Sequence, residues 1–133
     1  MRIDFNNIKP IYIQVADAIE DDIITGKLAE GDAVYSQLTL SKELKINPAT
    51  AAKGINQLVS KGILQKQRGL SMTVAIGSKD RLLDERRETE IYKLAENLVN
   101  TAIKVGLSES SVISKVSELF NSRENNKEGD LDE

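Results

Sequence analysis

The sequence predicts a mainly α-helical fold with one small β-hairpin, organised in two parts. Apolar residues recur three and four positions apart in five separate stretches, which is the period of a helix with one buried face. Between the third and fourth stretches, residues 63–76 alternate around a glycine, which indicates a hairpin. The length of 133 residues fits one small domain with an appendage.

The first predicted helix runs from about Pro10 to Thr25 and ends at Gly26. Its buried face would be formed by apolar residues spaced by three and four, namely Ile8, Ile11, Val15, Ala18, Ile19 and Ile23. Pro10 suits the first turn, because the N–H group that proline lacks has no partner there. The residues LAEGDAVY, 28–35, then form a short extended link with a Gly-Asp turn.

The second predicted helix is short. Ser36 can cap its start, because a serine hydroxyl accepts a hydrogen bond from an N–H group of the first turn. Leu40 and Leu44 lie one turn apart on its buried side, and the helix ends near Leu44. A turn of about three residues separates it from the next helix.

The third predicted helix begins at Pro48, after the capping residue Asn47, and runs to Lys61, where Gly62 ends it. The residues that face the core are Ile46, Ala51, Ile55 and Leu58. The outward face carries only small, amide and basic side chains: Ala49, Thr50, Lys53, Gly54, Asn56 and Gln57. Two short helices joined by a tight turn form a helix-turn-helix.

The hairpin follows the third helix directly and completes a recognisable order of elements. The segments ILQKQ, RGLS and MTVAI form two strands around a turn with the basic residues Lys66 and Arg68 near its tip. A helix, a helix-turn-helix and a hairpin in this order are typical of a winged helix. The third helix would suit the major groove of DNA, because its outward face combines small residues with Thr and Asn and lacks carboxylates.

The distribution of charge supports a polyanionic partner. The whole chain has a net charge of −3, but residues 1–79 carry +2 and residues 80–133 carry −5. Residues 44–79 contain no acid and include six basic residues, which are Lys45, Lys53, Lys61, Lys66, Arg68 and Lys79. A chance run on a solvated surface is the alternative to the exclusion of acids by a nucleic-acid partner.

Two further amphipathic helices follow the hairpin. The first would extend from residue 80 to Val105, before Gly106, and the second would begin after the capping residue Ser108. Their apolar stripes predict a homodimer interface, for which the candidate residues are Leu83, Ile91, Leu94, Leu98, Ala102, Val112, Val116 and Phe120. Packing back onto the winged helix is the alternative. The polar, acidic segment 124–133 is expected to be disordered.

Composition excludes several other classes of function. The chain has no Cys and no His, which removes thiolate and imidazole chemistry, zinc sites and disulfides, and we expect no metal and no cofactor. Adjacent acids such as Asp21 and Asp22 are interpreted as solvated charges, because no nucleophile or glycine loop accompanies them. No apolar run could cross a membrane, and the first ten residues lack a secretion signal, so a cytoplasmic protein is expected.

Three stretches resemble the GntR family of bacterial transcription regulators, in its short YtrA-type branch. They are PIYIQVADAIEDDIITGKLAEGD (10–32), LSKELKINPATAAKGINQLVSKGIL (40–64) and KQRGLSMTV (66–74). The resemblance implies that residues 1–79 form a winged helix-turn-helix domain, that 80–123 form a dimerisation region, and that the protein is a homodimeric repressor of operator DNA. A module that binds another protein is the alternative, and its binding would depend less on salt.

The resemblance also implies roles for single residues. Ser36 and Asn47 would hold phosphates, and Ala49, Thr50 and Lys53 would face the major groove. Arg68 and Gly69 would approach the minor groove or its edge, and Asn56 and Lys66 complete the predicted DNA contacts. The chain departs from the family pattern where Leu38 and Leu70 replace basic residues. No effector is assigned: residues 80–133 provide too little chain to enclose a metabolite pocket within one subunit, and binding of a small molecule at the subunit interface is the alternative.

Overall fold

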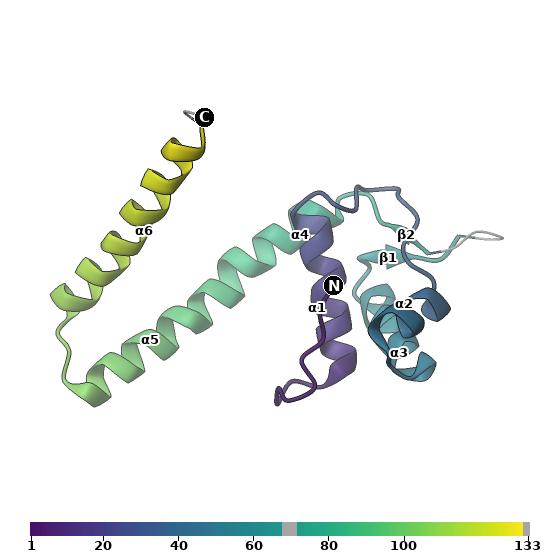
Figure 1. The fold of residues 1–133 in the computed structure, drawn as a ribbon, viewed down its shortest axis with the longest axis horizontal. Coiled ribbons are helices and arrows are strands. Elements are labelled where there is room, and N and C mark those ends of the chain that lie inside the picture. Colours follow the sequence, from purple (N-terminus) through teal and green to yellow (C-terminus); the bar gives the residue numbers. More distant parts are fainter. Residues whose placement is uncertain (68–71, 132–133) are drawn as a thin grey trace. The chain divides into compact units, whose positions relative to one another are not determined.

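The chain folds into two compact units, Met1–Arg86 and Arg87–Glu133, in a computed structural model that describes residues 1–67 and 72–131 (Figure 1). Side chains are described as far as residue 126. The first unit contains α1 to α3, a two-stranded hairpin and α4, whereas the second contains α5 and α6. Each unit is therefore treated separately below.

Helix α1 (Ile11–Ile24) supplies the centre of the first unit. Val15, Ile19 and Ile23 are fully buried, which confirms the predicted face of this helix. Ile8 was expected on the same face but is fully exposed, because the chain before Pro10 forms turns and bends rather than helix. The periodic spacing of Ile8 therefore had no structural consequence.

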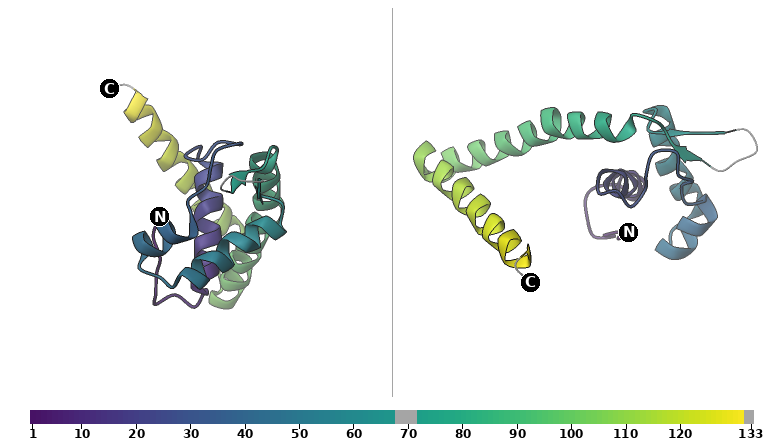
Figure 2. Two further views of the ribbon diagram at one scale, coloured as in Figure 1. Left: turned by 90° about the vertical axis from the view of Figure 1, so that its right-hand side faces the viewer. Right: turned by 90° about the horizontal axis from the view of Figure 1, so that it is seen from above.

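The helix-turn-helix follows the predicted boundaries closely. Helix α2 (Gln37–Leu44) is capped by Ser36, whose Oγ accepts a hydrogen bond of 3.1 Å from the Thr39 N–H. Helix α3 (Pro48–Ser60) is capped by Asn47 and has proline at its first position, as predicted. Helices α2 and α3 lie against each other, and α1 crosses α3 and packs against it (Figure 2).

The hairpin consists of β1 (Leu64–Gln65) and β2 (Thr73–Val74), which pair antiparallel with Leu64 opposite Val74. The link before α2 joins this sheet, because Ala33 forms a bridge with Thr73. Leu64 and Val74 are buried, so the base of the hairpin is anchored in the core. The strands are shorter than the predicted segment 63–76, and the tip, residues 68–71, lies outside the described residues.

Helix α4 (Ser78–Glu85) belongs to the first unit, whereas the sequence placed the domain boundary between residues 79 and 80. Its Leu82 is 0% exposed and lies in the core. Its Arg81 donates hydrogen bonds of 2.7 and 3.2 Å to the carbonyl oxygens of Lys61 and Gly62, at the end of α3. Removing the chain after residue 79 would therefore delete part of the core.

The second unit contains α5 (Ile91–Val105) and α6 (Glu109–Leu131). A π-helical turn, η1 (Arg86–Glu90), precedes α5, so the helix predicted from residue 80 to Val105 is not one regular α-helix. Gly106 ends α5 with a φ of 77°, and the Ser108 hydroxyl caps α6. The helix α6 continues to Leu131, through most of the segment that was expected to be disordered. A shortage of apolar residues limits the packing of this segment, but it does not prevent the backbone from forming a helix. No helix within residues 1–67 and 72–131 combines the length and the apolar character needed to cross a bilayer.

Candidate nucleic-acid interface

The outward face of α3 is the centre of the candidate interface. Ala49, Lys53 and Asn56 are exposed, and Thr50 is half-buried, so the spacing along α3 places these four predicted residues on one side of the helix. Gly54, which the sequence pattern placed on the same outward face, is instead buried. The reason is that α1 passes directly over it, as described below. The exposed face of α3 is consequently narrower than the sequence pattern indicated.

The amino-terminal ends of α2 and α3 carry no acid in their first turns. The positive end of each helix dipole is therefore available to an anion. However, the two side chains predicted to bind phosphates, those of Ser36 and Asn47, already form hydrogen bonds within the protein. Ser36 donates to Thr39 Oγ1 at 2.8 Å, and Asn47 Oδ1 accepts from the Ala49 N–H at 2.8 Å. These two residues thus shape the helix ends in the absence of DNA.

A hollow of about 260 Å³ brings three predicted residues together from different elements. Ser36 lies at the start of α2, Asn56 on α3, and Lys66 directly after β1. Tyr35 also lines the hollow, and its hydroxyl donates to Asp22 at 3.2 Å. Burial, followed by the charge of Asp22, raises the pKa of the Tyr35 hydroxyl above its ordinary value.

The basic residues of segment 44–79 have different environments. Lys45, Lys53 and Lys66 are exposed, and within the described part of the chain no carboxylate forms an ion pair with them. Lys61, in contrast, bonds Glu20 at 3.0 Å and Glu85 at 3.2 Å. Lys61 therefore belongs to an ion-pair network that links α1, α3 and α4.

Two features of the interface remain, the tip of the wing and the position of Leu38. Arg68 and Gly69, predicted at the tip of the wing, lie outside the described residues. Leu38, which occupies a position where the family pattern has a basic residue, is 63% exposed at the start of α2. An exposed leucine at this place offers apolar contact but no charge for a phosphate.

The predicted dimer residues fall into two groups. Most lie exposed on α5 and α6, and these are Ile91, Leu94, Leu98, Val116 and Phe120. Ala102 is buried and Val112 is half-buried near the turn between the two helices. Leu83 belongs to α4 in the first unit and is half-buried there. The structure therefore assigns Leu83 to a different unit from the other predicted interface residues.

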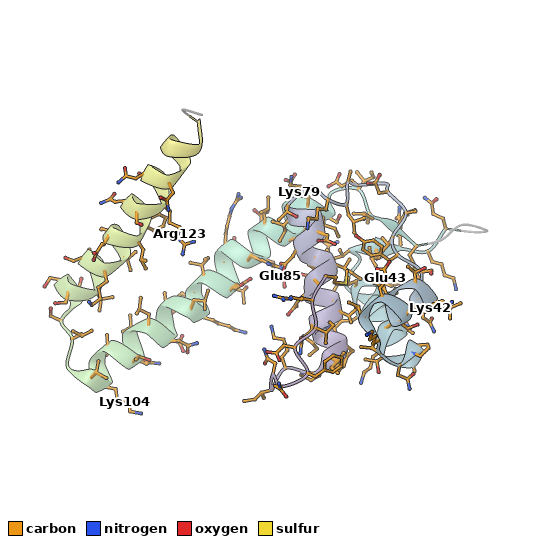
Figure 3. All side chains as sticks on the ribbon, viewed as in Figure 1. Lys42, Glu43, Lys79, Glu85, Lys104 and Arg123 are labelled. Atoms are coloured by element: carbon orange, nitrogen blue, oxygen red, sulfur yellow. The ribbon has the colours of Figure 1, made fainter. Side chains whose placement is uncertain are left out.

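Sequence reasoning missed a second exposed apolar row on α5, formed by Tyr92, Val99 and Ile103. These residues are separated by seven and four positions, so the helical period contains the signal that could have found them. With them, the apolar side of α5 covers about 180° of the helix at 100° per residue, against about 100° for an ordinary surface helix. Arg123 lies beside Val116, Leu119 and Phe120 on α6, whereas Lys104 lies on the side of α5 opposite its apolar residues (Figure 3).

A helix-turn-helix anchored to a hairpin, with an acid-free and basic face on its second helix, defines a winged-helix DNA-binding protein. Residues 11–74 match the family of bacterial regulatory proteins described as the gntR family. The chain belongs to this GntR family and is a DNA-binding transcription regulator. Because the relatives are regulators, the chain is not an enzyme, as expected from its sequence.

Two curated relatives illustrate how much of the chain is shared. The uncharacterised HTH-type transcriptional regulator YhcF of Bacillus subtilis is 27% identical over 109 residues, which span 82% of this chain and 88% of YhcF. MngR of Escherichia coli, named as the repressor of a mannosyl-D-glycerate transport and metabolism system, is 36% identical over 86 residues. That match spans 65% of this chain but only 32% of MngR.

Solved structures of similar proteins extend the comparison. A GntR family transcriptional regulator from Listeria monocytogenes has a TM-score of 0.71 and 26% identity, over 86% of this chain and 98% of its own. YtrA from Sulfolobus acidocaldarius has a TM-score of 0.55 and 25% identity, over 92% and 97%. The AraR DNA-binding domain, in complex with operator ORX1, has a TM-score of 0.51 and 26% identity, over 56% and 99%.

Proposed function

We propose that the chain is a sequence-specific repressor of the YtrA-type branch, which binds an inverted-repeat operator as a homodimer in the cytoplasm. The observation that carries the proposal is the exposed face of α3, where Ala49, Lys53 and Asn56 lie on a helix whose own sequence contains no acid. The AraR DNA-binding domain is similar over 56% of this chain and was solved with its operator, and MngR is named a repressor. The similarity to YtrA spans both units, which supports the choice of branch.

In this proposal α3 enters the major groove and the hairpin 63–76 acts as a wing. Small side chains at the start of α3 allow close approach, and Lys53 meets a phosphate or a base edge. The hollow that contains Ser36, Asn56 and Lys66 would take the sugar-phosphate strand between α3 and the hairpin. Arg68 and Gly69, predicted at the tip of the wing, would contact the minor groove or its sugar-phosphate edge.

The homodimer is proposed from the apolar surface of the second unit. Leu94 is 57% exposed, Ile103 is 71% exposed and Phe120 is 66% exposed, although each has a large apolar side chain. Exposed apolar surface of this extent marks an association site. A second copy of the chain suits it, because twofold symmetry presents two DNA-binding units to an operator with two half-sites.

The DNA-binding part of the proposal is tested with two variants of α3 and a matched control. A selection of bound duplexes from a random pool gives the operator, and fluorescence anisotropy then gives affinities at several salt concentrations. Lys53→Glu and Ala49→Leu should abolish specific binding, whereas Lys27→Glu, an equal change of charge after α1, should lose much less. If both α3 variants kept operator affinity, α3 would not be the reading helix.

The dimer is tested by analytical ultracentrifugation of full-length Leu94→Glu and of Asn97→Glu, which places the same charge on the polar side of α5. We expect Leu94→Glu to be monomeric and to lose operator affinity, and Asn97→Glu to remain dimeric. A chain ending after Arg86 keeps α4 and should also be monomeric. A dimeric Leu94→Glu variant would exclude the proposed interface.

The alternative function, a module that binds another protein, is tested by the salt dependence of DNA binding. DNA binding that does not weaken with salt would favour this protein-interaction module.

A further inference from the structure

Helix α1 reaches the proposed DNA-reading face through one aromatic side chain. The Nζ of Lys53 on α3 lies 4.1 Å from the centroid of the Tyr12 ring on α1. The contact depends on a close crossing of the two helices at Gly54, where an added Cβ would lie 2.8 Å from the Tyr12 carbonyl oxygen. The crossing therefore brings the start of α1 beside the middle of α3.

We infer that Tyr12 is a positioning residue for DNA binding, which holds the Lys53 ammonium in place for a phosphate or base edge. The inference rests on the proposed role of α3 and adds to it a residue outside the helix-turn-helix and the wing. A lysine side chain has four rotatable bonds, and it loses their freedom when it binds. A ring that restricts Lys53 before DNA arrives lowers this entropic cost.

The chemical nature of the group that holds Lys53 matters as much as the position of that group. A carboxylate would also hold Lys53, but it would neutralise the charge that attracts DNA. The ring of Tyr12 is neutral, so Lys53 keeps its full charge, and the N–H groups that point away from the ring stay available to acceptors. Lys61 shows the contrasting arrangement at the carboxyl end of α3, where Glu20 and Glu85 bind the ammonium.

The expected size of the effect follows from the strength of an exposed cation–π contact. Such a contact changes an equilibrium constant by about two- to fivefold. A dimer that uses the contact in both subunits would lose about four- to twenty-five-fold in operator affinity.

The test is a double-mutant cycle in the full-length protein on the selected operator, with Tyr12→Leu, Lys53→Gln and the double variant. Tyr12→Leu should lower affinity by about four- to twenty-five-fold, but it should leave the salt dependence unchanged because no charge is removed. Lys53→Gln should lower both affinity and salt dependence. In the Lys53→Gln background, Tyr12→Leu should have no further effect.

Tyr12→Phe is the matched control, since it keeps the ring and removes only the hydroxyl. We expect its affinity to stay within about twofold of the wild type. Equal losses in Tyr12→Phe and Tyr12→Leu would overturn the inference, because the hydroxyl would then be the contacting group. Unchanged or tighter binding by Tyr12→Leu would also overturn it, and so would additive losses in the double variant.

The same series separates this inference from the proposed function. If Lys53→Gln binds as tightly as the wild type, the DNA contact of Lys53 fails and the inference fails with it. If Lys53→Gln weakens binding and Tyr12→Leu does not, only the role of Tyr12 is wrong. Circular dichroism checks folding, and Tyr12→Met, with the same expected and contrary results, replaces Tyr12→Leu if the latter unfolds.

Discussion

The replacement Gly54→Ala tests the close crossing of α1 and α3 on which the first unit depends. A methyl group at Gly54 would lie 2.8 Å from the Tyr12 carbonyl oxygen and 2.9 Å from Val15 Cγ1. The oxygen belongs to the backbone, and Val15 is 0% exposed. Neither neighbour can move away without shifting α1, so the substitution should force the two helices apart.

The net effect combines two opposing contributions. Overpacking of a close-packed site costs about 1–3 kcal/mol, and two contacts shorter than 3.0 Å place Gly54→Ala in the upper part of that range. Alanine is favoured over glycine within a helix by about 1 kcal/mol, which opposes the loss. We therefore expect a net destabilisation of about 1–2 kcal/mol, or about 5–15 °C in Tm for a unit of this size.

The assay is thermal unfolding followed by circular dichroism, at one fixed protein concentration because association would shift Tm. Hydrogen exchange of α1 and α3 would locate the loss in the first unit. Asn56→Ala is the matched control, since it places alanine on the exposed side of α3 and should leave Tm unchanged or slightly higher. A Gly54→Ala variant as stable as the wild type would refute the reasoning.

Three further predictions concern stability. Lys45→Gly should stabilise the protein by about 1 kcal/mol in urea unfolding, because Lys45 has a left-handed φ of 54° at the end of α2. Ser78→Ala should raise Tm, because among the described residues the fully buried Ser78 hydroxyl has no hydrogen-bond partner. Burial lowers the pKa of Lys61, but its hydrogen bonds and charge interactions with Glu20 and Glu85 raise it above 10.5 overall. The folded state therefore holds this proton more tightly than the unfolded chain, and stability should fall as pH rises above 10.5, less steeply in Lys61→Met.

Features fixed by local chemistry were predictable from the sequence. Ser36 and Asn47 cap α2 and α3 as expected, because their side chains satisfy N–H groups only two or three residues away. Gly62 and Gly106 have positive φ at helix ends for an equally local reason. The winged helix followed from the order of these local signals, and the family comparison confirms it.

Features that depend on residues far apart in the chain were not predictable. The spacing in α3 placed Gly54 outward, and only the path of α1 shows why it is buried. Leu82 and Leu83 are adjacent and equally apolar, so periodicity could not decide that Leu82 enters the core. The π-helical turn Arg86–Glu90 left no sequence signal, since its composition also suits an α-helix.

The charge pattern of the sequence overstates the positive charge that the first unit can offer to DNA. Segment 44–79 has no acid, but Lys61 within it bonds Glu20 from α1, so an acid-free segment is not an acid-free surface. Lys53 instead contacts the neutral ring of Tyr12, which does not offset the charge of the ammonium. The first unit of each chain consequently relies on few cations, and a single copy of it would bind DNA weakly at cellular salt. When two chains are joined, binding of the second copy becomes intramolecular and the affinity for DNA rises without new contacts, which is the physical reason to expect the dimer.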